Sequence, residues 1–572
     1  MIFTEDEQTV VLYFFTTTDS RVACATDNMP SSLWAYLVGS YSRSHEPIRQ
    51  RLLVSLFRDS GLTVSEFATA IRDSNSAYLG HALGKAESFL RKWAVEYGHN
   101  SLKDSSIDRF AIEGCSILAA KAFEDSELGA YQEKSTRYLP FSVASVDDLA
   151  LPLNCFDSAG CLLPKYRDVF TQVFTAYEQL LAYWSDRHFQ ESDPAQFVND
   201  AARRRTTKAQ AFDKARYYLP VCVKTSFGAT IPTRETSRLI SRLLAHPLSE
   251  VRSLAEDLLF EVFKINPGLF THVGPDTSFD GFDPIETSGC FWPEPRRTSL
   301  GQVEDLEHAL VLTSKCSSVG ATVQVTLPKD LRQRTAASFI AFYAKRSVPG
   351  YFRPICGITD SLSTNLVQLH SSADEPELDN ILAVAEEHYK NVRTDYHKDV
   401  PRYLDHIHVT LDVLMDYGAY RDLQRHRAGK QDIVSFLDSV GVIEFPGFDE
   451  MPMSLQVLCR NAVSALTGLK NAEYSACLKS DVPRQSNSSA YLRLLGHPVL
   501  WTYTCSLRQL VYLTELRSQP SGHISYRTIT CEVAALVSKY LPWLFPYVDH
   551  SSNATRALAE NCIQKKLSSI DT

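Results

Sequence analysis

Two short polar segments, far apart in the chain, carry the residue types that could bind a small charged molecule. One is the string QEKSTRY at 132–138, which holds the carboxylate of Glu133, the hydroxyl of Ser135 and the guanidinium of Arg137. The other is the triplet RHR at 425–427, in which two guanidiniums flank an imidazole. Such groups bind anionic substrates through charge-assisted hydrogen bonds. We therefore interpret the two segments as parts of one split site.

The two arginines of the triplet can converge on one ligand only under a structural condition. Residues two apart on a continuous helix point about 200° away from each other. The helix must therefore end close to Arg425, and Gly429 supplies a stop signal just after it. Taken alone, a basic helix C-terminus that complements the helix dipole is the simpler explanation of this triplet.

A second set of arginines follows in the last part of the chain, at Arg508, Arg517 and Arg527. Guanidinium groups present planar forks of donors that suit phosphate, so converging arginines indicate a phosphorylated small molecule. Each of them could instead be a surface or salt-bridged residue. The string at 132–138 could equally consist of helix-capping and solvated residues.

The length and composition describe an ordinary globular chain that needs two hydrophobic cores. Its 572 residues are 44% hydrophobic and 22% charged, and one core rarely organises more than about 250–300 residues. Helical and strand periodicity fails over residues 271–299, which contain three glycines and four prolines. We therefore expect an N-terminal domain at 1–270, a linker at 271–299 and a C-terminal domain at 300–572.

Charge, termini and cysteines exclude several classes of protein. A net charge of −9 offers no basic surface for a nucleic-acid backbone. The start MIFTEDEQTV lacks the positive charge of a signal peptide, and no run of 18 apolar residues could span a membrane. Thirteen cysteines without a CxxC pair suit reduced thiols, and no set of histidines has the spacing of a metal site. We expect a cytoplasmic protein without nucleic-acid, membrane or metal partners.

Hydrophobic periodicity predicts both helices and strands, and therefore an α+β fold of mixed or antiparallel sheets with packed helices. The predicted helices are 76–97, 166–189, 233–263, 378–392, 401–427 and 506–517, and the predicted strands are 9–15, 321–327 and 406–414. The order of patterns in 110–127 is repeated in 409–427, since each contains an apolar segment, a helix and a charged triplet. This repetition predicts an internal duplication.

The chain resembles the flavin-dependent thymidylate synthases, whose signature is RHRxxSxNExSxRY, once in each half. In the first half, DSELGAYQEKSTRY at 125–138 retains the final ExSxRY, but the RHR triplet is replaced by Asp125, Ser126 and Glu127. In the second half, RHR survives at 425–427, whereas the tail is lost except for Ser435. Each half therefore resembles the complementary part of one signature.

Flanking segments extend this resemblance over most of both halves. In the first half GHNSLKD at 98–104 is similar to the family's GHxSxxE element, FAIEGCSILA at 110–119 to its FxIEGVSRA segment, and ARYYLP at 215–220 to its ARxxLP loop. In the second half, SLRQLVYLTELRSQPSGHISYR at 506–527 resembles the family's arginine-bearing helix, with all three arginines at the same spacing. The complementary loss of motifs is expected if duplication turned a homodimer interface into one between two halves of a chain.

The resemblance implies reductive methylation of dUMP to dTMP with FAD, methylenetetrahydrofolate and NADPH. It implies a homodimer that mimics the family's homotetramer. The catalytic residues would be Ser135, Arg137 and Arg517. The substrate-binding residues would be Glu133, Ser135, Arg137, Arg216, Asp422, Arg425 and Arg517. The cofactor-binding residues would be His99, Arg425, His426, Arg427 and Tyr512.

Three positions depart from the family pattern. Asp422 stands where the family has a glutamine that contacts the nucleotide, Tyr512 replaces a flavin-contacting asparagine, and Ser506 replaces the asparagine of the NxR element. Two alternatives to thymidylate synthesis therefore stay open. The chain could be a flavoenzyme that modifies another pyrimidine nucleotide, or an inactive homologue that binds a nucleotide or serves in an assembly.

Overall fold

The structure is a computed structural model that describes most of the chain. The described residues are 3–20, 23–76 with gaps at 32, 35–36, 39–45 and 58–62, 100–273 without 247, 266 and 271–272, 322–344, 375–479 without 435 and 437–440, 488–519 and 522–549. Apart from Ser76, the helix predicted at 76–97 lies outside these residues, and so do His99 and Ser435. Val273 is the only described residue of the linker expected at 271–299, so the domain limits stay a prediction.

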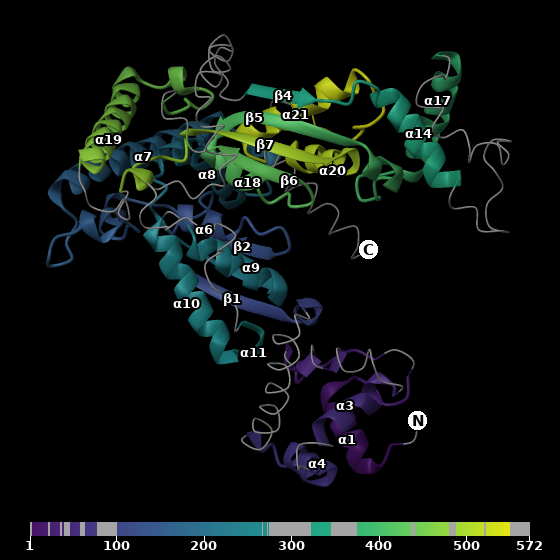
Figure 1. The fold of residues 1–572 in the computed structure, drawn as a ribbon. Coiled ribbons are helices and arrows are strands. Elements are labelled where there is room, and N and C mark those ends of the chain that lie inside the picture. Colours follow the sequence, from purple (N-terminus) through teal and green to yellow (C-terminus); the bar gives the residue numbers. More distant parts are fainter. Residues whose placement is uncertain are drawn as a thin grey trace.

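Within its described residues, the first half contains an antiparallel sheet, a set of helices near the N-terminus and further helices around the sheet (Figure 1). The helices near the N-terminus are α1 (Glu5–Phe14), α3 (Ile48–Phe57) and α4 (Val64–Arg72). The sheet has the order β1-β3-β2 and is made of β1 (Ile107–Ser116), β2 (Ala130–Glu133) and β3 (Lys224–Pro232). The other elements are η2 (Asn100–Ser105), α6 (Ile117–Phe123), η3 (Val143–Asp147), η4 (Leu153–Cys155), α7 (Pro164–Glu191), η5 (Pro194–Gln196), α8 (Asp200–Ala215), η6 (Arg216–Tyr218), α9 (Thr233–Leu244), α10 (Ser249–Ile265) and α11 (Pro267–Phe270).

The second half contains a second antiparallel sheet, of order β4-β5-β7-β6. Its strands are β4 (Thr322–Thr326), β5 (His408–Asp416), β6 (Lys430–Val434) and β7 (Pro498–Ser506). The helices are α14 (Leu331–Ala344), α17 (Glu375–Val392), η7 (Arg402–His406), α18 (Tyr417–Leu423), η9 (Phe448–Glu450), α19 (Met453–Lys479), η11 (Ser488–Tyr491), α20 (Leu507–Arg517) and α21 (Ile524–Ser538). Helices packed on antiparallel sheets confirm the α+β fold class. In the described part of the chain, no helix is both long and apolar enough to cross a membrane.

The two halves repeat one succession of elements, as the sequence predicts. The series β1, α6, β2, α7, β3, α9, α10 of the first half corresponds to β5, α18, β6, α19, β7, α20, α21 of the second. The sheet order agrees as well, because β3 lies between β1 and β2 just as β7 lies between β5 and β6. The fold therefore supports the internal duplication.

The halves meet through equivalent backbone positions. Pro220 and Leu494, each four residues before the central strand of its half, form an isolated antiparallel bridge. On either side of it, the Val221 amide donates to the Arg493 carbonyl at 2.9 Å, and the Leu495 amide donates to the Leu219 carbonyl at 2.9 Å. A contact that joins each position to its own counterpart is the signature of a two-fold interface. One chain is therefore arranged like a dimer.

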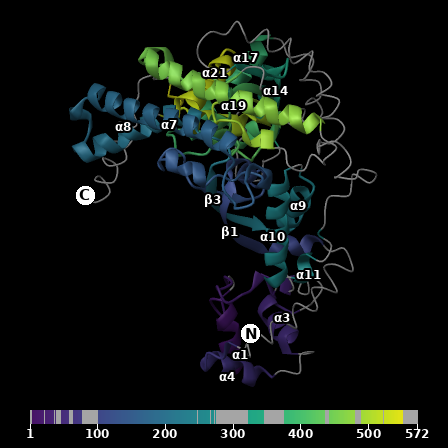
Figure 2. The same ribbon diagram turned by 90° about the vertical axis from the view of Figure 1, so that its left-hand side faces the viewer.

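The long helices α7 and α19 lie side by side across this interface (Figure 2). They belong to one continuous hydrophobic core that includes buried residues of both halves, among them Trp184 on α7 and Phe445 of the second half, whose rings are 6.2 Å apart. A second core lies wholly in the first half, between its sheet, α1, α3, α4, α9 and α10. The shared core fixes the two halves against each other.

Three of the predicted elements are wrong. Residues 9–15, predicted as a strand, lie mostly in α1, because Thr4 and Glu7 form a capping box and Val10, Val11 and Phe14 share a buried face. The helix predicted at 401–427 is η7, β5 and α18 instead, and alternating burial along β5 confirms the competing strand at 406–414. The helix predicted at 233–263 is divided into α9 and α10. The helices at 166–189, 378–392 and 506–517 and the strand at 321–327 are confirmed.

Candidate functional site

The RHR triplet follows the end of a short helix. Asp416 caps α18, since its carboxylate accepts a hydrogen bond from the Ala419 amide at 2.7 Å. The helix ends at Leu423, and Gln424 is its C-terminal cap. Arg425 and Arg427 therefore lie beyond the helix, which fulfils the condition that the sequence set for their convergence. The Gln424 side chain donates to the Lys121 carbonyl at 3.1 Å and so joins this turn to the first half.

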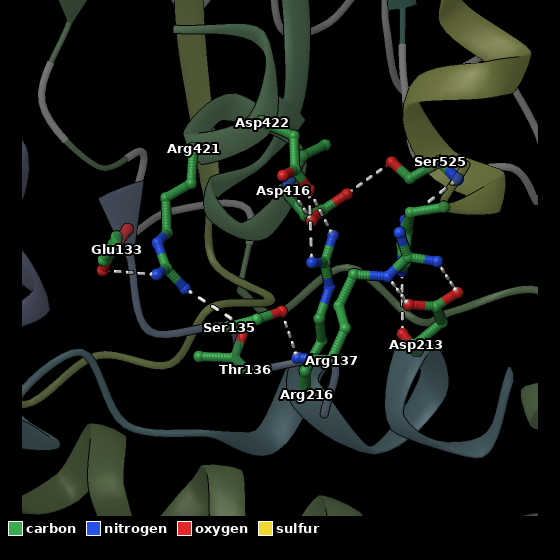
Figure 3. A network of polar contacts seen from close by, with 12 residues as sticks. Glu133, Ser135, Thr136, Arg137, Asp213, Arg216, Asp416, Arg421, Asp422 and Ser525 are labelled. Carbon is green, nitrogen blue, oxygen red and sulfur yellow. Dashed lines mark hydrogen bonds and ion pairs between the residues drawn. The ribbon is translucent and has the colours of Figure 1, made fainter. Parts of the chain in front are cut away.

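Glu133, at the end of β2, lies in a buried ion-pair network that joins both halves (Figure 3). Its carboxylate accepts from the Arg421 guanidinium at 2.7 Å and lies 2.9 Å from the Lys121 ammonium, which also pairs with Glu124. Burial acts to raise the pKa of Glu133, but the charges of Arg421 and Lys121 outweigh it and lower the pKa to about 2. Glu133 thus binds protein cations in this structure.

Arg137 and Arg216 each pair with an aspartate close by (Figure 3). Arg137 donates from Nε to Asp213 Oδ1 at 2.5 Å and from Nη2 to Asp213 Oδ2 at 2.7 Å. Arg216 donates to Asp422 Oδ2 of the second half at 3.3 and 3.4 Å. Burial would raise the pKa of Asp422, but Arg216, Arg425, Arg517 and Arg137 together hold it well below its ordinary value. Guanidinium groups from both halves therefore surround one carboxylate.

Close approach of the two halves at this point requires Gly418, near the start of α18. A Cβ atom there would lie 3.0 Å from Asp416 Oδ1 and 3.4 Å from Arg216 Nε. A Cβ atom would therefore press first on Asp416, the cap of α18, and would pack directly against the Arg216 guanidinium.

Ser135 and Thr136 lie between these two ion-pair groups. The Ser135 hydroxyl oxygen accepts from the Arg137 backbone amide at 3.2 Å, which leaves its hydrogen available to a ligand. The Thr136 hydroxyl accepts from Arg421 at 3.3 Å. The string at 132–138 is therefore ordered by contacts with the second half.

His426 is a buried, neutral imidazole. Its Nε2 accepts a hydrogen bond from Arg517 Nε at 2.8 Å, and Gln509 lies 3.5 Å from its Nδ1. Burial and the charges of Arg517, Arg427 and Arg425 lower the pKa of His426 to about 3.

The two triplet arginines differ in their surroundings. Arg425 is exposed, and no hydrogen bond or ion pair to its side chain occurs among the described residues. Arg427 donates to the Glu124 carbonyl at 3.2 Å and lies over the Tyr131 ring at 4.4 Å, so it holds the two halves together. Arg425 is therefore the triplet arginine that is free for a ligand.

A cavity of about 480 Å³ adjoins His426. Gln509 and Tyr512 line it and also contact His426, the Tyr512 ring with its centroid 5.8 Å from the imidazole. Further lining residues include Arg393, His397, Lys398, Ser506, Arg508 and Glu515. Small-molecule sites usually enclose about 300–1,000 Å³, so this cavity is of suitable size.

Apart from His99, which lies outside the described residues, the structure brings the predicted site residues together within one chain. Glu133, Ser135, Arg137 and Arg216 come from the first half and Asp422, Arg425, His426, Arg427, Tyr512 and Arg517 from the second. Sequence reasoning missed Lys121, Asp213 and Arg421, which neutralise the buried charges. The spacing gave a signal for two of them, because Asp213 precedes Arg216 by three residues and Arg421 precedes Arg425 by four.

A pair of equivalent hydrogen-bond clusters flanks the interface between the halves. Asp416 accepts from the Ser525 hydroxyl at 2.5 Å and from the Tyr217 hydroxyl of the other half at 3.3 Å. At the counterpart positions, Ser116 donates to Glu250 at 2.7 Å, and the Tyr491 hydroxyl donates to Glu250 at 2.9 Å. The acid and the hydroxyl have exchanged places, while the tyrosine comes from the opposite half each time.

At the equivalent positions across the two-fold arrangement, the arginines and the histidine of the site are replaced. Asp125, two residues after α6, replaces Arg425 and lies 3.5 Å from Arg242. Leu243, the eleventh residue of α9, replaces Arg517, and Ala490, eight residues before β7, replaces Arg216. Ser126 replaces His426 and donates to Glu235 at 2.8 Å. The polar side chains of this second region, Asp125 and Ser126, therefore pair with other residues of the protein.

Comparison with known proteins agrees with the duplicated arrangement. Residues 53–268 match the family model of thymidylate synthase complementing protein. A UPF0159 protein of Chlamydia pneumoniae is 26% identical over 562 residues, which cover 96% of each chain. A UPF0159 protein of Thermoplasma acidophilum is 22% identical and covers 78% of this chain and 85% of its own length. A flavin-dependent thymidylate synthase of Sulfurisphaera tokodaii is 25% identical over 229 residues, 39% of this chain and 77% of its own. Residues 53–268 thus match the thymidylate synthase complementing protein family, and the UPF0159 protein of Chlamydia pneumoniae matches the chain over nearly its whole tandem length.

Proposed function

We propose that this protein is a flavin-dependent thymidylate synthase that methylates dUMP to dTMP reductively, with methylenetetrahydrofolate and NADPH as co-substrates. One observation carries the proposal. Arg137, Arg216, Arg425 and Arg517, from both halves of one chain, act on the same carboxylate of Asp422. A converging set of guanidiniums with a serine hydroxyl among them has the donor chemistry that a pyrimidine nucleotide requires.

The phosphate would bind at the guanidiniums that have capacity left. Arg425 is exposed and unpaired within the described residues, and Arg517 uses only its Nε on His426. Arg137 and Arg216 are bound to Asp213 and Asp422, so they order the site while these aspartates neutralise them. Ser135 can donate its hydroxyl hydrogen to a carbonyl oxygen of the base.

The residues around the cavity beside His426 fit a flavin. Tyr512 offers a half-exposed aromatic face, and the Arg508 guanidinium and the amide of Gln509 provide polar groups for a ring edge. The guanidiniums of Arg517, Arg427 and Arg425 lie close to the neutral His426, and their positive charge would stabilise an anionic reduced ring. When bound and reduced by NADPH, the flavin would pass on the reducing equivalents of the methylation.

A second candidate function rests on Asp422. A fixed negative charge inside the nucleotide pocket favours a base that presents a hydrogen-bond donor to it, so the substrate could be another pyrimidine deoxynucleotide.

We also propose a cytoplasmic homodimer as the working form, because one chain already resembles a dimer.

Tritium release from 5-labelled dUMP tests the proposal. The purified protein should be yellow and should release tritium only when NADPH and methylenetetrahydrofolate are both present. Release from labelled dCMP in place of dUMP would favour the second candidate. A colourless protein that releases no tritium from either nucleotide, even with added FAD, would contradict both and indicate an inactive homologue.

A further inference from the structure

Asp422 carries a carboxylate oxygen that no described residue engages. Both hydrogen bonds to its side chain, from the two terminal nitrogens of Arg216, end on Oδ2. Among the described residues, no donor contacts Oδ1. The Asp422 side chain is 14% exposed, whereas that of Arg216 is 3% exposed. The oxygen without a donor therefore belongs to the more exposed partner of this ion pair, which Figure 3 shows beside Arg216.

Asp213, the carboxylate that pairs with Arg137, differs from Asp422 in its contacts. Asp213 uses both oxygens on Arg137, one on Nε and one on a terminal nitrogen, and its side chain is 12% exposed. Each oxygen of Asp213 thus accepts one hydrogen bond from Arg137, in a bidentate pair. Of the two aspartates, only Asp422 retains an oxygen without a donor.

An ionised carboxylate only accepts hydrogen bonds, so it selects what can lie against it. The charges of four neighbouring arginines keep Asp422 ionised. A phosphate or carbonyl oxygen placed at Oδ1 would meet another acceptor, whereas an N–H group would form a charge-assisted hydrogen bond. The ligand must therefore turn a donor toward Asp422 and its phosphate toward the free guanidinium of Arg425.

We propose that Asp422 is a specificity-determining residue that recognises the base of the nucleotide by accepting a ring N–H or amino hydrogen at Oδ1. This inference rests on the proposed function and deepens it. The chemistry is shared by the ring N–H of uracil and the amino group of cytosine, and carboxylates accept readily from both. A ligand without a base gains nothing from Asp422.

The test compares three ligands with wild type, Asp422→Asn and Asp213→Asn by calorimetric titration. The ligands are dUMP, dCMP and 2-deoxyribose 5-phosphate, which keeps the sugar and phosphate but has no base. Asp422→Asn should weaken binding of the preferred nucleotide about tenfold or more, because a charged acceptor becomes a neutral one. It should leave binding of the sugar phosphate unchanged or tighter, because a negative charge is lost. Asp213→Asn should change all three ligands by one common factor.

Equal effects of Asp422→Asn on nucleotide and sugar phosphate would overturn the inference, since Asp422 would then act only as a counter-ion of Arg216. So would unchanged or tighter nucleotide binding. Whichever of dUMP and dCMP loses more affinity identifies the donor. Failure of the wild type to bind any nucleotide would instead overturn the proposed function, and this inference with it. Melting temperatures of the variants show that each ligand was offered a folded protein.

Discussion

Individual side chains in this site divide into those that the protein uses itself and those that it leaves for a ligand. Glu133, Arg137 and Arg427 are engaged across the interface or with nearby carboxylates, while Arg425 is exposed. The sequence motifs identified these residues but could not make this division. Which guanidinium is occupied depends on the carboxylates of Asp213 and Asp422 and on the Glu124 carbonyl, whose positions only the folded chain reveals.

Arg425→Ala should therefore weaken nucleotide binding without affecting folding. The lost contact is a charge-assisted hydrogen bond to phosphate, so the dissociation constant should rise about tenfold or more. The melting temperature should stay within about one degree, because Arg425 makes no ion pair with a described residue. Calorimetric titration and thermal unfolding measure both quantities. The matched control is Arg238→Ala on α9, an arginine whose side chain is 65% exposed and which is not among the residues of the proposed site. Equal affinities of both variants would contradict the assignment.

Glu133→Gln should lower the free energy of unfolding of the protein. The Glu133 side chain is 1% exposed and pairs with Arg421 and Lys121, so removing its charge leaves buried cations uncompensated, at a cost of about 3 kcal/mol. The folded pKa of about 2 is below the ordinary 4.5. The ionised pair is therefore fully stabilising above about pH 4.5, and this stabilisation is lost as the pH falls toward 2.

Denaturant unfolding from pH 7 to pH 3 measures that contribution of Glu133. The difference in unfolding free energy between wild type and Glu133→Gln should shrink as the pH falls through this window. Glu127→Gln is the matched control, because Glu127 forms a surface pair with Lys430 and such pairs contribute little. A difference that is independent of pH would show that Glu133 is not held ionised by its partners.

At the scale of elements, the sequence predicted the helices and strands with strong periodicity and failed where tertiary contacts decide. The pattern of 378–392 and 506–517 identified α17 and α20. The apolar, β-branched run at 9–15 resembled a strand, but its burial against α4 and the Thr4 cap make it helical. The segment 401–427 fitted two periodicities at once, and the register of β5 against β7 decides for a strand.

The two capping clusters allow an exchange experiment between the halves. Asp416 accepts from Ser525 and Tyr217, while at the counterpart positions Ser116 and Tyr491 donate to Glu250. Asp416→Ser alone should destabilise the protein by about 2–3 kcal/mol, because buried donors lose their acceptor. Ser525→Glu alone should also destabilise it, because two carboxylates then lie together.

The double variant Asp416→Ser/Ser525→Glu reproduces the arrangement of the first half. It should therefore recover at least half of the stability that the two single variants lose together, in a double-mutant cycle of unfolding free energies. Strict additivity of the two losses would contradict the equivalence of these clusters. Recovery would show that the duplicated elements retain interchangeable local chemistry.

At the scale of the whole molecule, the two halves form a two-fold arrangement that gathers the predicted site residues on one side. The resemblance predicted that the motifs had separated between the halves. The chain brings them together across the bridge of Pro220 and Leu494. The long-range arrangement depends on the shared core of α7 and α19, which no local pattern encodes. At the counterpart positions, Asp125, Leu243 and Ala490 leave nothing to bind phosphate.

The central claim is that both halves of one chain form a single site for flavin and nucleotide. Titration of the purified, flavin-loaded protein with dUMP, followed by its visible absorption spectrum, tests it most directly. We predict a perturbed flavin band that saturates at one nucleotide per chain and is lost or shifted to much higher dUMP concentration in Arg425→Ala. Saturation at two nucleotides per chain, or a flavin spectrum indifferent to dUMP and to dCMP, would contradict the account.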